Sequence, residues 1–278
     1  MLEICRLTII ESLRRRLTLA LFATTLLLVG FTGWAFAKLS QLSSLQGIER
    51  LAQFSILLIF LMLLFTGMLA LTAVFSAAAA VAGELESGIA AAILARPIRR
   101  GAYLFGKWLG LAVVVGAFAL VAGSGEILVV SRVAGYAPPQ PVAGLLLIVA
   151  QALLLMTLSL ALATRLSAVT SAIVATVAFF LAWMLGTIDL MGLALRYPTL
   201  MAVGDVGKIL LPTNALWQAA EYHLEPPALI ALARGFTSFS GNPFMALAPQ
   251  PAAVLIWAAI WAAIVFGIGA LSLGRRQL

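Results

Sequence analysis

An uncharged apolar run from Leu51 to Gly83 places the strongest limit on how this chain can fold. A helix needs about 20 apolar residues to cross a hydrocarbon core of about 30 Å, and this run is longer than one crossing requires. Because a backbone surrounded by lipid must satisfy its own hydrogen bonds, a run of this length forms a helix. The run therefore predicts a membrane-spanning helix that projects beyond the membrane before it reaches Gly83.

The rest of the chain repeats this apolar pattern. It has 278 residues, of which 63% are hydrophobic and 10% are charged, whereas about 25% of the residues of an ordinary soluble domain are charged. Cutting the sequence at its charges and prolines predicts an all-α integral membrane protein with a single transmembrane domain over residues 1–278. The six predicted spans are residues 17–37, 54–82, 108–130, 142–164, 166–188 and 252–273.

Two segments outside the spans are also predicted to be helical. Residues 1–16 combine apolar residues at helical spacing with basic residues, which is typical of a helix at a membrane surface. Residues 189–251 hold most of the prolines, and we predict a small cap of short helices packed on the membrane face. Six spans put both termini on one side. Most of the 17 Lys and Arg residues fall on that side, which predicts cytoplasmic termini and an outward-facing cap in a cytoplasmic (inner) membrane.

The remaining composition argues against several classes of function. A net charge of +7 could suit a nucleic-acid-binding protein, but the basic residues lie at the ends of apolar runs, as in membrane proteins. Cys5 is the only cysteine and His223 the only histidine, so no internal disulfide and no His/Cys metal cluster is expected. With so few acids and one histidine, no catalytic set can be assembled. We therefore expect neither an enzyme nor a cofactor in this chain.

Charge gathers in the stretch from Gly83 to Gly110, between the second and third predicted spans. The charged residues are Glu84, Glu86, Arg96, Arg99, Arg100 and Lys107. An apolar stripe at helical spacing predicts a helix over residues 84–96. The stripe consists of Leu85, Ile89 and Ile93. Acidic residues lie in the first turn of this helix and Arg96 lies at its end, as the helix dipole favours, and Pro97 stops it. The stretch is either a solvated loop or a helix that docks a soluble partner.

The same stretch contains a partial phosphate-binding motif. Gly101 to Lys107 matches the pattern GxxxxGK[ST] except at its last position, where Trp108 replaces the hydroxyl residue that holds magnesium. The pattern also requires a preceding β-strand, and none is predicted. We therefore expect no ATP site in this chain.

Two acidic residues lie near the membrane interior, Glu126 in the third span and Asp189 after the fifth. A carboxylate in the hydrocarbon region is costly, which makes it a candidate for a proton or cation path. Both residues lie near the outer ends of their spans, however, so the alternative is that their side chains simply reach the interface between membrane and water.

The central stretch resembles a region of the permease subunits of ABC-2 type transporters. The resemblance rests on Glu84 through Gly88, on Arg96-Pro97 with Arg99, and on Gly106-Lys107. It extends to the six spans, to the amphipathic helix before the first span and to the extracellular element before the last. Ile89 departs from the family, which commonly has Thr at this position, and the departure is expected to weaken the helix cap.

This resemblance implies a transport function that the chain performs with partners. Two permease chains, as a homodimer, would form an export pathway for a lipid-like, amphiphilic or drug-like cargo. Two separate ATP-binding subunits would bind ATP and Mg and dock on a cytoplasmic coupling helix. The residues implied in this coupling are Glu84, Leu85, Glu86, Gly88, Ile89, Ile93, Arg96, Pro97, Arg99 and Lys107.

Two alternatives come from other classes of protein. The chain also looks similar to the permease used in maturation of nitrous oxide reductase, in which outer loops engage a periplasmic partner. It would then be a membrane scaffold or assembly factor that binds a soluble partner through the central helix and transports nothing, and residues 189–251 would offer a site for a periplasmic partner. The second alternative is an ion or proton channel that uses Glu126 and Asp189.

Overall fold

The computed structural model describes residues 2–14, 16–42, 46–94, 99–234 and 246–276, and all regular structure in these ranges is helical. Six helices of this part are long and apolar enough to cross a membrane, which confirms the predicted all-α membrane fold. They are α2 (Arg16–Leu42), α3 (Gly47–Glu86), α5 (Arg100–Ala134), α6 (Pro141–Leu162), α7 (Ala168–Leu195) and α11 (Ala252–Gly274). The short helices are α1 (Leu2–Arg14), α4 (Ile89–Leu94), α8 (Pro198–Leu210), α9 (Thr213–Leu224) and α10 (Pro227–Ala233).

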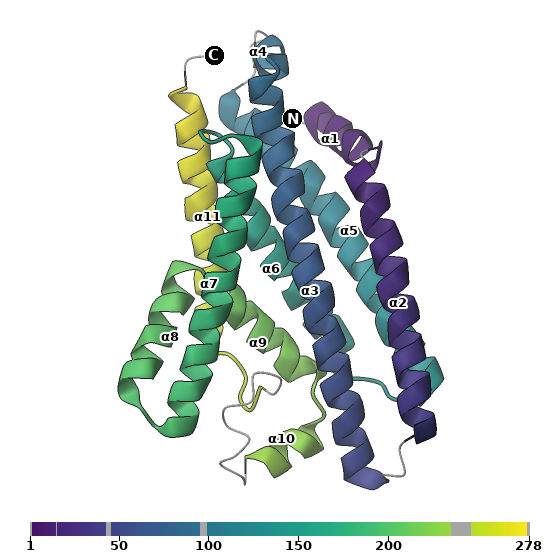
Figure 1. Ribbon diagram of the computed structural model, residues 1–278. Helices are drawn as coiled ribbons and strands as arrows, with labels where there is room; N and C mark the ends of the chain where they lie inside the picture. Colours follow the sequence, from purple (N-terminus) through teal and green to yellow (C-terminus); the bar gives the residue numbers. More distant parts are fainter. Residues whose placement is uncertain (1, 15, 43–45, 95–98, 235–245, 277–278) are drawn as a thin grey trace.

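Helix α3 runs through the length of the bundle and α6 packs along it (Figure 1). Buried side chains such as Leu58 and Phe65 of α3 meet Ile148 of α6 in the main hydrophobic core. Helix α5 joins this core closely at Gly123, where an added Cβ would lie 2.4 Å from a Leu145 methyl group. Helix α2 packs on α5 and α11 packs on α6. Both termini, α1 and α4 lie at one end of the molecule, which we call the α4 end.

Several membrane-crossing helices extend beyond the predicted spans. Helix α3 begins at Gly47 and ends at Glu86, so it is longer than residues 54–82, and it projects as its apolar run indicates. Helix α7 continues past residue 188 and ends at Leu195. The next residue, Arg196, has a left-handed conformation. Hydrocarbon thickness sets how much of a helix must be apolar, whereas a helix ends where the backbone leaves the helical region.

Residues 189–251 include the short helices α8, α9 and α10, and their position as an outward-facing cap stays a prediction. Most of the 12 residues of α9 are buried, and the helix packs against α6 inside the bundle. Close packing is possible because Gly144 of α6 has no side chain, and an added Cβ would lie 2.8 Å from Leu224. Helix α8 instead folds back along α7 (Figure 1).

Candidate functional site

The connection between α3 and α5 differs from the predicted single helix over residues 84–96, and that prediction is wrong. Helix α3 ends at Glu86, Gly88 turns the chain with φ +77°, and the separate helix α4 covers only Ile89–Leu94. A positive φ is strained for residues with a side chain, so the break occurs at the glycine. The two glutamates therefore lie in the last turn of α3. At this end the helix dipole disfavours negative charge.

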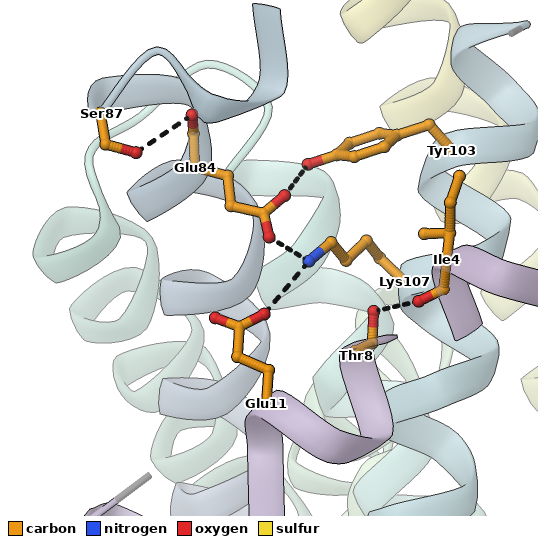
Figure 2. Close-up of polar contacts among 7 residues, drawn as sticks. All are labelled: Ile4, Thr8, Glu11, Glu84, Ser87, Tyr103 and Lys107. Atoms are coloured by element: carbon orange, nitrogen blue, oxygen red, sulfur yellow. Dashed lines mark hydrogen bonds and ion pairs between the residues drawn. The ribbon is translucent and has the colours of Figure 1, made fainter. Parts of the chain in front are cut away.

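Glu84 compensates for this unfavourable position by pairing inside the protein (Figure 2). Its side chain is buried, with 8% of the residue exposed. The carboxylate accepts a hydrogen bond of 2.6 Å from the Tyr103 hydroxyl and another from the Lys107 ammonium group. Lys107 is buried as well, and its ammonium nitrogen lies 3.5 Å from a Glu11 carboxylate oxygen. We call Glu11, Glu84, Tyr103 and Lys107 the Glu84 network.

The Glu84 network joins three helices at the α4 end. Glu11 comes from α1, Glu84 from α3, and Tyr103 and Lys107 from α5, where a spacing of four places both side chains on one face. Helix α1 lies close to α5 at Gly110. A Cβ added there would lie only 2.8 Å from the Cys5 carbonyl oxygen and from Thr8. The network and this contact hold α1, α3 and α5 together.

Burial makes the Glu84 network sensitive to the loss of any one charge. Two charges removed from water are stable only when they pair well, and deleting one partner leaves an uncompensated charge that costs about 3–5 kcal/mol. Glu11 is partly exposed, so the network has one member in contact with water. The chemistry of the network is that of an ionic link between helices.

Other residues of the predicted coupling segment divide into exposed and packed groups. Leu85 and Ile93 pack against the hydrophobic core, whereas Ile89 is 52% exposed, so the predicted stripe does not form one docking surface. Glu86 is exposed and accepts a 3.3 Å hydrogen bond from the backbone N–H of Ala168 at the start of α7. Arg99 is exposed just before α5. Arg96 and Pro97 lie outside the described residues.

Sequence reasoning missed Tyr103 and Glu11 as members of this site. The available signal for Tyr103 was its spacing of four from Lys107 on a helix. The sequence also gave no indication of a second set of hydrogen bonds at the α4 end. Arg100 donates to the carbonyl oxygens of Leu273 and Gly274 at 3.0 and 3.1 Å, which ties the start of α5 to the end of α11.

The two predicted intramembrane acids are not part of the Glu84 network: Glu126 lies farther along α5, and Asp189 lies on α7. Glu126 of α5 is fully buried and accepts a 3.0 Å hydrogen bond from Thr32 of α2, while its second oxygen has no partner in the described part of the chain. Asp189 of α7 is buried and lies 2.8 Å from the ammonium nitrogen of Lys208 on α8. Asp189 thus links α7 to α8. A role for either acid in a proton or cation path stays a prediction.

The partial phosphate-binding motif is helical. Residues 101–107 all belong to α5, and the Lys107 ammonium group is bound to Glu84. A phosphate-binding loop instead presents backbone N–H groups after a strand. Across the described ranges, no group of three or more His, Cys, Asp or Glu side chains could hold a metal ion.

The six helices of the described ranges that are long and apolar enough to cross a membrane define a multi-pass membrane protein. The family model described as ABC-2 family transporter protein matches residues 2–278, and the chain belongs to this family. The resemblance to ABC-2 permeases is thereby confirmed. Such a permease is the membrane component of a transporter, is not itself catalytic, and normally works with ATP-binding subunits. A comparison with curated proteins found no match to this chain.

Proposed function

We propose that this chain is the transmembrane subunit of an ATP-driven exporter and that the connection between α3 and α5 receives the motion of a separate ATP-binding subunit. The observation that carries the proposal is the position of Glu84. This residue lies in the turn of α3 next to the exposed connection, and its buried carboxylate binds α5 through Tyr103 and Lys107. Lys107 extends the link to Glu11 on α1.

The Glu84 network explains how a displacement of α4 would reach the membrane helices. Buried ionic contacts are screened far less by water and salt than surface pairs are. The end of α3 therefore moves together with α5 and α1, because separating these helices would break buried contacts at a high cost in free energy. Helix α3 has 40 residues, which is about 60 Å at 1.5 Å per residue. A rigid helix of this length carries a displacement from the α4 end to the opposite end.

The docking surface in this proposal consists of the exposed residues at the α4 end, Glu86, Ile89 and Arg99. Ile89 would enter an apolar cleft of the ATP-binding subunit, while Glu86 and Arg99 would make ionic contacts around it. Leu85 and Ile93 support the connection from inside, because both pack on the core. The α4 end would then face the cytoplasm, in agreement with the excess of basic residues predicted for that side.

An apolar groove supports the preference for a lipid-like, amphiphilic or drug-like cargo. It has a volume of about 490 Å³ and is lined by α1, α2, α3 and α5. Leu26, Leu69, Phe118 and Val121 form much of its wall. Thr72 brings a hydroxyl group to the wall, but that hydroxyl donates to the Met68 carbonyl of its own helix at 2.8 Å. The groove therefore suits alkyl chains better than polar cargo.

Co-purification with the ATP-binding subunit tests the docking surface. That subunit would bind ATP and Mg, and the permease would act as a homodimer. We expect Glu86→Lys with Ile89→Asp to abolish co-purification and permease-stimulated ATP hydrolysis. Glu49→Lys is the matched control, because Glu49 is an exposed glutamate at the other end of the same helix. Wild-type complex formation and turnover in the Glu86/Ile89 variant would refute the proposal.

A further inference from the structure

Helix α9 carries a row of polar side chains on one buried face. The spacing is four residues, which keeps side chains on the same side of a helix. The row consists of Thr213, Trp217, Glu221 and, directly after the helix, Glu225. Each has a buried polar atom without a hydrogen-bond partner in the described part of the chain, namely Thr213 Oγ1, Trp217 Nε1, Glu221 Oε1 and Glu225 Oε2. Such unpartnered atoms are rare in folded proteins.

The two acids of this row lie where negative charge is most unfavourable. Only 1% of Glu221 and 2% of Glu225 is exposed. Both are at the C-terminal end of α9, where the free carbonyl groups already carry partial negative charge. Among the described residues, neither acid forms an ion pair with a basic side chain. Two buried carboxylates one turn apart also repel each other, so one or both must be neutralised.

The charged groups on neighbouring elements are engaged elsewhere. Lys208 of α8 binds Asp189 of α7 and Asp205 of its own helix. On α3, Arg50 lies over the ring of Phe54, and Glu49 is exposed. His223 of α9 bonds Gln140. The remaining neighbours, α6, α10 and α11, contain no charged residue.

The Tyr136 hydroxyl is a further buried polar group near this pair. It has no well-formed hydrogen bond within the described ranges. Burial raises the pKa of Tyr136, the neighbouring Ser55 hydroxyl opposes this rise, and the charge of Glu225 reinforces it.

Protons neutralise this pair better than a metal ion would. A calcium site needs six to eight oxygen ligands, whereas the described residues include no group of three or more acidic, His or Cys side chains that could hold a metal. Burial raises the pKa of Glu225 to about 8, against the hydrogen bond from the Ala246 backbone. Burial, and then the charge of Glu225, raises the pKa of Glu221 well above its ordinary value.

We propose that Glu221 and Glu225 form a proton-binding pair that holds α9 inside the bundle. With protons bound, the side chains are neutral and can donate hydrogen bonds to the unpartnered oxygens of the row. Loss of the protons leaves two uncompensated charges at the helix end and weakens the packing of α9 on α6. The contacts that would weaken include the packing of Leu224 against Gly144 and the 3.1 Å hydrogen bond from the Gln140 N–H to the His223 carbonyl oxygen.

This inference goes beyond the proposed transport function and does not depend on it. The acid pair belongs to α9, which lies in the half of the molecule away from α4 (Figure 1). A change of pH would therefore alter helix packing in that half without acting on the docking surface for a partner.

Infrared spectroscopy of the full chain in lipid nanodiscs tests proton binding directly. We expect Glu221→Gln with Glu225→Gln to remove intensity from the carboxylic acid C=O band at pH 7, while Glu49→Gln at an exposed site removes none. A pKa of about 8 for Glu225 means that about nine in ten of these groups carry a proton at pH 7. An identical band in wild type and the double variant would overturn the proposal.

Hydrogen–deuterium exchange of the wild-type chain gives a second test that needs no variant. After correction for the intrinsic effect of pH, we expect α9 to exchange at least about tenfold faster at pH 9 than at pH 6, since ionisation destabilises its packing. Equal protection at both pH values would contradict the proposal. Restoration of protection at pH 9 by Ca²⁺ would also contradict it, because the pair would then be a metal site.

Discussion

Replacing Lys107 with Met tests whether the Glu84 network joins the helices at the α4 end. Methionine keeps much of the length and apolar contact of the lysine side chain but removes the charge. Glu84 then retains its hydrogen bond from Tyr103 and loses its buried positive partner. An uncompensated buried charge of this kind costs about 3–5 kcal/mol.

The expected effect is large enough to measure by thermal unfolding in detergent. For a chain of this size, about 3–5 kcal/mol lowers the apparent Tm on the order of 10 °C. Tryptophan fluorescence can follow the transition, since the chain has 6 Trp residues. Lys38→Met is the matched control, because Lys38 is an exposed lysine of α2, and its replacement is expected to shift Tm by only a degree or two.

A second substitution separates loss of charge from loss of packing. Adding Glu84→Gln to Lys107→Met replaces the pair with two neutral side chains, which is often tolerated where a lone buried charge is not. We expect the double variant to recover about half or more of the lost stability. The reasoning is refuted if Lys107→Met melts like Lys38→Met, or if the double variant is no more stable than the single one.

Three further predictions follow from other contacts. Gly110→Leu should push α1 away from α5 and raise the rate at which the buried Cys5 thiol, the only thiol in the chain, reacts with a maleimide by about tenfold or more. Stability should fall as pH rises from about 4.5 to about 8, because folded Glu225 holds its proton more tightly than the unfolded chain does, with a total effect on the order of 5 kcal/mol. Asp189→Asn should lower stability by about 1–3 kcal/mol in a melting assay, since Lys208 keeps only its exposed partner.

Each of these predictions has an outcome that contradicts it. Unchanged maleimide reactivity in Gly110→Leu would mean that α1 does not depend on this close contact. The pH effect should shrink in Glu225→Gln and disappear when Glu221→Gln is added, so an equal slope in that double variant would assign the effect to other groups. If Asp189→Asn melts like wild type, the ion pair between α7 and α8 contributes nothing to stability.

Some features of this fold follow from the local sequence, and others depend on contacts between distant segments. The six spans were predictable because crossing a membrane demands a run of apolar residues, and such a run is visible without knowing what it packs against. The break at Gly88 was not, since the repeat of Leu85, Ile89 and Ile93 fits a continuous helix as well. Glycine permits a left-handed turn but does not require one.

The candidate site shows the same division. Charges between the second and third spans marked the region, and they included Glu84 and Lys107. Their pairing depends on how α3 and α5 pack, because the two residues belong to different helices. Likewise, the prolines and charges of residues 189–251 suggested a cap, while the close fit of Leu224 on Gly144 places α9 inside the bundle.

The sequence by itself determined that this protein is helical, crosses the membrane several times and carries a charged connection after its second span. These properties depend on the local balance of apolar and charged residues along the chain. Only the tertiary structure decided that Glu84 points inward, that Ile89 points outward and that α9 is buried with two acids. The burial of a polar side chain depends on partners brought from distant segments, and local sequence does not encode those distances.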